Sequence, residues 1–320
     1  MDDVVIGLAS LRGRDADRAG AKAATLAGLA ASGLAVPTGF VITGAVYDQV
    51  VAAGPIGAEL RQLYLEALGT DDETTQFELL CSRMQNLVRE AVIEGPVRAA
   101  ILAAYEQLGA DSPVAVRPSP IAADAARPSV AALTPSRIGV EGPAALLDAV
   151  VESWACQFNG AVLARRLGKD IPQGPPPSMA VLVQTMVDTR VSGVAFTADP
   201  ATGRRDRVVI DAVPGPSAAL TRADARPDTY TFDSEGPTLL HVRPWPAAPI
   251  ETSFQRPNGV LTAQAAVAVA ELALSASARL GGTPQDVEWA FDENTLWLLR
   301  ARPITLLPDP HHTSTNSATP

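Results

Sequence analysis

The residues of this sequence that are best suited to chemistry are charged rather than nucleophilic. Its two cysteines, Cys81 and Cys156, lack metal-ligand spacing, so we interpret both as reduced, packed thiols. His241 is the only histidine outside the Ser/Thr/Pro-rich tail, and we expect it to be structural or exposed. Only two of the 25 basic residues are lysines, Lys22 and Lys169, so a lysine is informative in this arginine-rich background. Catalysis by a thiol or an imidazole of this chain is not predicted.

Four of the charged residues fall on a predicted β-hairpin near the C-terminal end. Its strands would be Asp286–Phe291 and Leu296–Arg302, joined by a three-residue loop, Glu293–Thr295. This loop length buries three apolar pairs on one face: Phe291 with Trp297, Trp289 with Leu299, and Val287 with Ala301. The opposite face then carries two acid–base pairs: Glu288 with Arg300, and Asp286 with Arg302. A shorter loop would place Arg300 among the apolar side chains, so the pattern favours the longer one.

The elements that position these residues are predicted from apolar periodicity. Helical spacing predicts helices over 19–32, within 55–110 and over 263–280, and one amphipathic helix through Leu147, Val150, Trp154 and Phe158. Short β-branched or alternating runs predict strands at 40–43, 114–117, 179–187, 193–198, 207–212 and 228–232. The last four strands are typical of an antiparallel meander. We therefore expect a helix-rich lobe at 1–112, a sheet lobe at 113–306 and a disordered tail at 307–320.

Composition limits the class of protein. A chain of 320 residues with 47% hydrophobic and 19% charged residues is a globular chain of about two lobes. The formal net charge of −10 disfavours nucleic acid or an anionic membrane as a partner, since no excess of cations exists. No apolar run approaches the roughly 18 residues needed to cross a bilayer, and the acidic start is unlike a secretory signal. We predict a cytoplasmic protein with neither kind of partner.

Four segments, read together and in order, resemble one known family. They are GAKAATL (20–26) followed by VPTGF (36–40), VAVR (114–117), MAVLVQTMVDTRVSGVAFTADP (179–200) and QDVEWAFDENTLWLLRARPIT (285–305). This combination resembles the ATP-binding domain shared by phosphoenolpyruvate synthase, pyruvate phosphate dikinase and rifampicin phosphotransferase. The resemblance runs from about residue 19 to residue 305, which is nearly the whole chain.

The resemblance implies an α+β, two-lobed ATP-grasp fold with mostly antiparallel sheets, which holds ATP between its lobes. Carried over by position, the site residues are Lys22 and Arg117 on the phosphates, Gln184 at the adenine hinge, Glu288 on Mg²⁺, and Arg300 and Arg302 in the hairpin. Arg302 would be the catalytic contact to the transferring phosphoryl group. These residue types suit those roles, because arginine and lysine bind phosphate oxygens and carboxylates bind Mg²⁺. The resemblance also implies that a separate phosphohistidine or acceptor-domain protein completes the phosphotransfer.

Departures from the family pattern bear on the activity. The family's Ser/Thr-rich run and its glycine-containing phosphate loop correspond to 118–124 and 129–135 here, where hydroxyls, an acid and the glycine are missing. The family's Gly-Leu-Gly-Glu segment is GPSA at 215–218, without the acid. Arg300 replaces a glutamine and has no acceptor atom for a metal. Because Arg300 also faces Glu288, we expect metal-dependent transfer to be impaired, while the added guanidinium can partly replace Mg²⁺ against the phosphates.

Two functional hypotheses remain open at this point. Retention of Lys22, Arg117, Glu288 and Arg302 favours the kinase component of a split phosphotransferase, whereas the altered loop and Arg300 favour a catalytically impaired nucleotide sensor or scaffold. Each site residue also has a structural alternative. Lys22 can be solvated, Arg117 can form a structural ion pair, Gln184 can be an ordinary polar group of a strand, and the hairpin charges can simply pair across strands.

Overall fold

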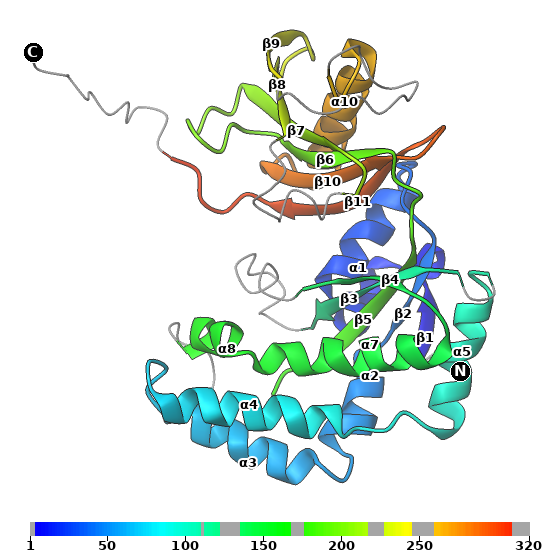
Figure 1. Ribbon diagram of the computed structural model, residues 1–320, viewed down its shortest axis with the longest axis vertical. Helices are drawn as coiled ribbons and strands as arrows, with labels where there is room; N and C mark the ends of the chain where they lie inside the picture. The colour runs from blue at the N-terminus through cyan, green and yellow to red at the C-terminus, as the bar shows by residue number, and fades with distance from the viewer. Residues whose placement is uncertain are drawn as a thin grey trace, which may run out of the picture. The chain divides into compact units, whose positions relative to one another are not determined.

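The computed structural model describes residues 4–109, 112–121, 135–167, 176–216, 227–244 and 259–308. By contacts the chain divides into two compact units (Figure 1). Unit 1 comprises Met1–Ala31 and Pro37–Met186, and unit 2 comprises Ser32–Val36 and Val187–Pro320. Several segments named above lie outside the described residues: 122–134 of the altered loop, 217–218 of GPSA, and the predicted tail beyond residue 308 with its two histidines.

Unit 1 is built on a five-stranded antiparallel sheet in the order β1-β2-β5-β3-β4. Its strands are β1 Val5–Gly7, β2 Gly39–Ile42, β3 Val114–Pro120, β4 Arg137–Val140 and β5 Met179–Thr185. Its helices are α1 Ala16–Ala31, α2 Gly44–Tyr47, α3 Gly57–Leu68, α4 Thr75–Arg89, α5 Gly95–Glu106, α7 Pro143–Ala155 and α8 Gly160–Leu167. Short turns of 3-10 or π type occupy Leu8–Ser10, Gly13–Asp15, Asp48–Ala52 and Cys156–Phe158.

The two faces of the unit 1 sheet are covered by different helices. Val116 of β3 and Val183 of β5 are fully buried in one apolar core with Met84 of α4 and Trp154 of α7. Because side chains alternate along a strand, the residues beside Val116 point to the opposite face, which α1 contacts. That second face of the sheet therefore bears Arg117.

The described residues of unit 2 form a six-stranded antiparallel sheet in the order β11-β10-β6-β7-β8-β9 and one long helix, α10 Ala263–Arg279. Its strands are β6 Val191–Phe196, β7 Arg207–Pro214, β8 Asp228–Asp233, β9 Leu239–Arg243, β10 Gln285–Phe291 and β11 Leu296–Pro303. Thr262 caps the start of this helix, and its hydroxyl accepts a hydrogen bond from the backbone N–H of Ala265. One row of paired residues, Val287, Ala195, Ile210 and Tyr230, is almost completely buried on the α10 side.

The predicted α+β class with mostly antiparallel sheets is confirmed, since every described strand pair is antiparallel. The meander differs in one strand. The residues 179–187, predicted to begin it, form β5 of the unit 1 sheet, and the meander consists of β6, β7, β8 and β9. No helix among the described residues is long and apolar enough to cross a membrane.

The contact boundary of unit 1 lies after Met186, whereas the sequence suggested a lobe boundary near Pro113. The reason is strand pairing. Both β3 and β5 belong to the sheet that contains β2, so the chain from 113 to 186 stays with the N-terminal elements. Apolar patterns indicate where strands lie, but they do not specify partners that are distant in sequence.

Strand β3 continues to Pro120, three residues beyond the predicted end at Arg117. Two prolines occur in this stretch, and proline has no N–H to donate to a sheet. The backbone N–H of Ile121 donates to the carbonyl of Ser178, next to the start of β5. Backbone nitrogens alternate in direction along a strand, so the nitrogens of Pro118 and Pro120 point away from β5. No hydrogen bond with β5 is lost at these two positions.

Candidate functional site

Lys22 lies at the start of the regular part of α1. Gly20 interrupts this helix with a φ of 76° and a ψ of 160°, a conformation that L-residues with a side chain rarely adopt. The helix continues from there, so Lys22 is in its first turn, and its side chain is half-buried. A Cβ at Gly20 would lie 2.3 Å from the carbonyl oxygen of Ser119 in β3. The beginning of the helix therefore approaches the strand as closely as glycine permits.

Arg117 is placed by β3 on the sheet face that α1 covers. It pairs directly with Leu182 of β5, while its neighbours Val116 and Pro118 are buried. The Arg117 side chain is itself half-buried. Ser119 lies two residues further along the strand on the same face, and its hydroxyl accepts a hydrogen bond from the backbone N–H of Ala23 at 3.3 Å. The structure thus links the strand of Arg117 to the helix of Lys22 inside unit 1.

Gln184 occupies the same face of the sheet at the end of β5. It pairs with Ala115 of β3, which lies two residues before Arg117. Its side chain is only 2% exposed, and Nε2 donates to the carbonyl oxygen of Pro37 at 3.2 Å. The next backbone N–H, that of Thr185, donates to Thr38. The Gln184 side chain therefore links the end of β5 to Pro37. Both places lie in unit 1, next to points where the chain passes to or from unit 2.

Glu288 and Arg300 of unit 2 form one of the two predicted acid–base pairs. They are directly opposite in the β10–β11 ladder, with Arg300 NH1 2.6 Å from Glu288 Oε1. Asp286 and Arg302 form the other, with Nε of Arg302 2.7 Å from Oδ2 of Asp286. Burial raises the pKa of Asp286 above its ordinary value, although the neighbouring Arg302 acts to lower it. Both predicted pairs are confirmed.

The apolar face of the hairpin differs from the prediction because a bulge follows Glu288. Val287 pairs with Ala301 as expected, but Trp289 pairs with Leu298 and Phe291 with Leu296. Leu298 is the fully buried residue of β11, in place of Trp297 and Leu299. The loop between the paired residues Phe291 and Leu296 has four residues, 292–295, instead of the predicted three. Asp292 accepts hydrogen bonds from the N–H groups of Asn294 and Thr295 and from Nε1 of Trp297, which holds that indole outside the apolar row.

A polar row that the sequence analysis did not identify crosses the sheet at the level of Glu288. In order, the paired residues are Arg300, Glu288, Val194, Asp211, Thr229 and Arg243. The Thr229 hydroxyl donates to Asp211 Oδ1 at 2.7 Å, and Arg243 donates to that hydroxyl at 3.2 Å. Since directly paired residues share a face, Asp211 lies on the same face as Glu288. The alternating run of β7 was the available signal for it.

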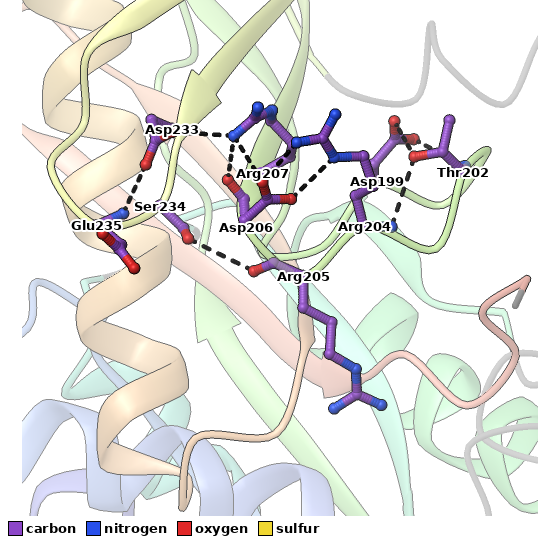
Figure 2. Close-up of polar contacts among 9 residues, drawn as sticks. All are labelled: Asp199, Thr202, Arg204, Arg205, Asp206, Arg207, Asp233, Ser234 and Glu235. Atoms are coloured by element: carbon purple, nitrogen blue, oxygen red, sulfur yellow. Dashed lines mark hydrogen bonds and ion pairs between the residues drawn. The ribbon is translucent and has the colours of Figure 1, made fainter. Parts of the chain in front are cut away.

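A second group of acid–base pairs in unit 2 lies at the turns that follow β6 and β8 (Figure 2). Arg204 NH2 is 2.6 Å from Asp206 Oδ2, and Arg207 NH1 is 2.9 Å from Asp233 Oδ2. Figure 2 shows the side chain of Arg205 directed away from the others. The Arg204–Asp206 pair is half exposed to water, and we assign it no role in a site.

The hairpin carboxylates do not fit a magnesium ion in this arrangement. Mg²⁺ in nucleotide sites usually takes one or two carboxylates together with phosphate oxygens. Here the carboxylates of Glu288 and Asp286 are each held by an arginine of β11. Among the described residues, no group of three or more His, Cys, Asp or Glu side chains could hold a metal ion. A metal at Glu288 would require Arg300 to release it.

Comparison with known proteins gives a consistent result. The family described as "Pyruvate phosphate dikinase, AMP/ATP-binding domain" matches residues 16–319 of this chain. The chain is 28% identical to a probable phosphoenolpyruvate synthase of Methanothermobacter thermautotrophicus, over 92% of this chain and 45% of the relative. It is 31% identical to a rifampicin phosphotransferase of Streptomyces sviceus, over 90% of this chain and 34% of the relative. It is 28% identical to the prodigiosin synthesizing transferase PigC of Serratia marcescens, over 94% of this chain and 33% of the relative.

The chain thus spans less than half the length of each of these relatives. Among solved structures, D-alanine-D-alanine ligase from Helicobacter pylori is similar with a TM-score of 0.32 and 12% identity, over 71% of this chain and 53% of the ligase. The family match, in contrast, covers nearly all of the chain. This protein belongs to the family of pyruvate phosphate dikinase AMP/ATP-binding domains.

Proposed function

We propose that the chain binds an adenine nucleotide as the ATP-binding domain of a phosphotransferase similar to phosphoenolpyruvate synthase and pyruvate phosphate dikinase. One observation carries this proposal. The family match coincides with the arrangement of unit 1, in which the helix of Lys22 and the strand of Arg117 are joined directly. Lysine supplies a compact charge and arginine a planar fork, and phosphate oxygens accept both. Gln184, next to the crossing at Met186, is our proposed adenine contact.

Arg302 is the residue of unit 2 that we propose meets the transferring phosphoryl group. The carboxylate of Asp286 contacts the Nε and NH2 atoms of Arg302, which fixes the plane of the guanidinium. Its NH1 is then the donor that we assign to a phosphate oxygen. Phosphoryl transfer depends mainly on such positioning and on charge neutralisation.

Magnesium has a reduced role in this proposal. Arg300 neutralises Glu288 at 2.6 Å, so the carboxylate expected to hold the ion is already paired. We propose that ATP binds without requiring Mg²⁺, because Arg300 cancels the negative charge of Glu288 and its guanidinium has further N–H groups that phosphate oxygens can accept. Glu288 would be the metal ligand only in a state where Arg300 has moved away.

The same salt bridge supports a second candidate function. A domain that binds ATP but lacks a competent metal site would act as a nucleotide sensor or a scaffold for a partner. In either case, we propose that transfer requires a phosphohistidine or acceptor domain outside these 320 residues, and that the protein acts in the cytoplasm. Mixing the chain and ATP with a phosphohistidine domain from a related synthase separates the two functions. Release of AMP supports the kinase, whereas ATP binding without AMP supports the sensor.

Thermal unfolding with increasing ATP tests nucleotide binding itself. A ligand that binds only the folded state stabilises it by about 2.7 kcal/mol at a hundred times its Kd. We expect this stabilisation for the wild-type chain and a much smaller one for Lys22→Ala and Arg117→Ala. Arg61→Ala, which changes an exposed arginine of α3, is the matched control and should respond as the wild type does. Absence of any shift at millimolar ATP would refute both candidate functions.

A further inference from the structure

The start of the helix that carries Lys22 lacks a cap of its own. A helix N-cap residue usually accepts a hydrogen bond with its side chain from the backbone N–H two or three positions later. Here Gly20 stands at that position, with a φ of 76°, and glycine has no side-chain acceptor. Ala23, three positions later, donates its N–H to the hydroxyl of Ser119 at 3.3 Å. The cap is supplied by β3, from a residue distant in sequence.

Close packing makes this contact specific. Ser119 is completely buried, and so is Ala23. A Cβ at Gly20 would lie 2.5 Å from the Ser119 hydroxyl and 2.7 Å from the carbonyl oxygen of Pro120. Proline on each side of Ser119 restricts the backbone of the strand. The helix start and the strand therefore have very little freedom to move relative to each other.

The hydrogen bond joins two backbones that carry cationic side chains. Ala23 directly follows Lys22, and Ser119 is two residues beyond Arg117 on the same face of β3. Any shift of the helix along the strand would change the separation of the ammonium and the guanidinium. Binding of a polyphosphate depends on that separation, while binding of a nucleoside without phosphates does not.

We propose that Ser119 is a positioning residue that caps the α1 helix from β3 and thereby fixes Lys22 relative to Arg117 for phosphate binding. This inference rests on the proposed binding of an adenine nucleotide. Ser119 acts through these two residues and does not itself contact the nucleotide. Gly20 contributes to the same arrangement, because its lack of a side chain lets the start of α1 approach β3 closely.

Calorimetric titration of the full chain with ATP and with adenosine tests the inference. We expect Ser119→Ala to weaken ATP binding about tenfold and to change adenosine binding less than about twofold. Ser119→Cys keeps the shape and a weak acceptor, so its ATP affinity should lie between those of the alanine variant and the wild type. Ser119→Cys also carries the test if the alanine variant fails to fold.

Two matched variants control for the loss of a buried hydroxyl and for backbone strain. Ser153→Ala removes another buried serine hydroxyl of unit 1, one that donates to the carbonyl of Ala149, and should leave ATP affinity unchanged. Gly95→Ala adds a methyl group at a φ of 57° in open space, and it should also leave ATP affinity unchanged. Gly20→Ala, in contrast, should weaken ATP binding, because its methyl group would meet Ser119 and Pro120.

The outcomes separate this inference from the function on which it rests. A wild-type chain that binds no ATP overturns the proposed function, and the role of Ser119 with it. Wild-type binding with unchanged ATP affinity in the Ser119 variants overturns the role of Ser119 alone. Equal losses of ATP and adenosine affinity also overturn it, because they indicate a general structural role. A loss of affinity for ATP but not for adenosine, smaller in Ser119→Cys than in Ser119→Ala, supports the role of Ser119.

Discussion

Two acid–base pairs in unit 2 have the same shortest nitrogen–oxygen distance in different surroundings. Arg300 and Glu288 of the hairpin are 2.6 Å apart, and so are Arg204 and Asp206 at the turn after β6. The hairpin side chains are 22% and 25% exposed, whereas those of the turn are 49% and 50% exposed. Water and salt screen the second pair far more than the first. A short distance between charges therefore does not indicate how much a pair matters.

The carboxyl groups in these two regions differ in the direction of their pKa shifts. The hydrogen bond from Arg204 lowers the pKa of Asp206. In the hairpin, burial raises the pKa of Asp286, although Arg302 acts to lower it. Water contributes little to stabilising the Asp286 carboxylate, which is 10% exposed, so this group depends on Arg302. Arg300 pairs with the carboxylate that we propose as the metal ligand, whereas Arg204 pairs with an exposed carboxylate to which we assign no role.

The largest expected difference concerns the response of ATP binding to Mg²⁺. In Arg300→Gln, Glu288 loses its partner and the new amide oxygen adds a second metal acceptor. We expect Mg²⁺ to strengthen ATP binding about tenfold in this variant and to have little effect in the wild type. Calorimetric titration with and without Mg²⁺ measures the difference. Arg204→Gln makes the same change at the exposed pair, and a gain of magnesium dependence there would contradict the comparison.

A smaller difference is expected in stability when one acid is removed. Glu288→Ala leaves the partly buried guanidinium of Arg300 without its acceptor, which we expect to lower the free energy of unfolding by about 1 kcal/mol. Asp206→Ala should produce a smaller loss, because Arg204 is then hydrated and Arg207, the other partner of Asp206, keeps its ion pair with Asp233. Urea denaturation of both variants tests this, and an equal loss in the two would show that exposure is not the deciding factor.

The two pKa shifts predict opposite dependences on pH. The folded state raises the pKa of Asp286 above 3.8, so its stabilising contribution is present below that pH and is lost as pH rises through the raised value. The pKa of Asp206 is lowered from 3.8, so its contribution is lost as pH falls through that range. The stability of the wild type minus that of Asp286→Asn should fall with rising pH, and the corresponding difference for Asp206→Asn should rise. Slopes of the same sign would contradict the assignment.

The smallest expected effect is the response to salt. In about 1 M NaCl the Debye length is about 3 Å, so interactions of exposed charges are largely screened. The loss of stability in Glu288→Ala should persist at high salt because the pair is partly shielded from solvent. Thermal unfolding at low and high salt tests this. A loss that disappears at high salt would place the hairpin pair in the same class as the turn pair.

Apolar patterns predicted most of the secondary structure but not the assembly of its strands. The alternation in β6, β7 and β8 and the helical spacing in α10 are local features, and the structure contains those elements. The membership of β5 and β3 in the unit 1 sheet depends on pairing with β2, which is far away in sequence. The extension of β3 through Pro118 and Pro120 was missed because proline is normally taken to end a strand.

The candidate site was predictable where it depended on strand alternation. The pairing of Glu288 with Arg300 was predicted from a three-residue loop, and it holds because the bulge after Glu288 compensates for a loop that is one residue longer. The bulge beyond that pair was not predictable from alternation, because it follows from the hydrogen bonds of Asp292 in the loop. The capping of Ala23 by Ser119 could not be inferred either, since it depends on how closely α1 approaches β3 at Gly20.

Above all, we propose that Arg300 pairs with the carboxylate that a divalent ion would otherwise use, while the chain still binds ATP. Titration of the wild-type chain with ATP, first in a metal chelator and then in Mg²⁺, tests this most directly. We expect saturable binding in both conditions with nearly equal Kd. Binding that is tenfold or more tighter in Mg²⁺, or that occurs only in its presence, would contradict it.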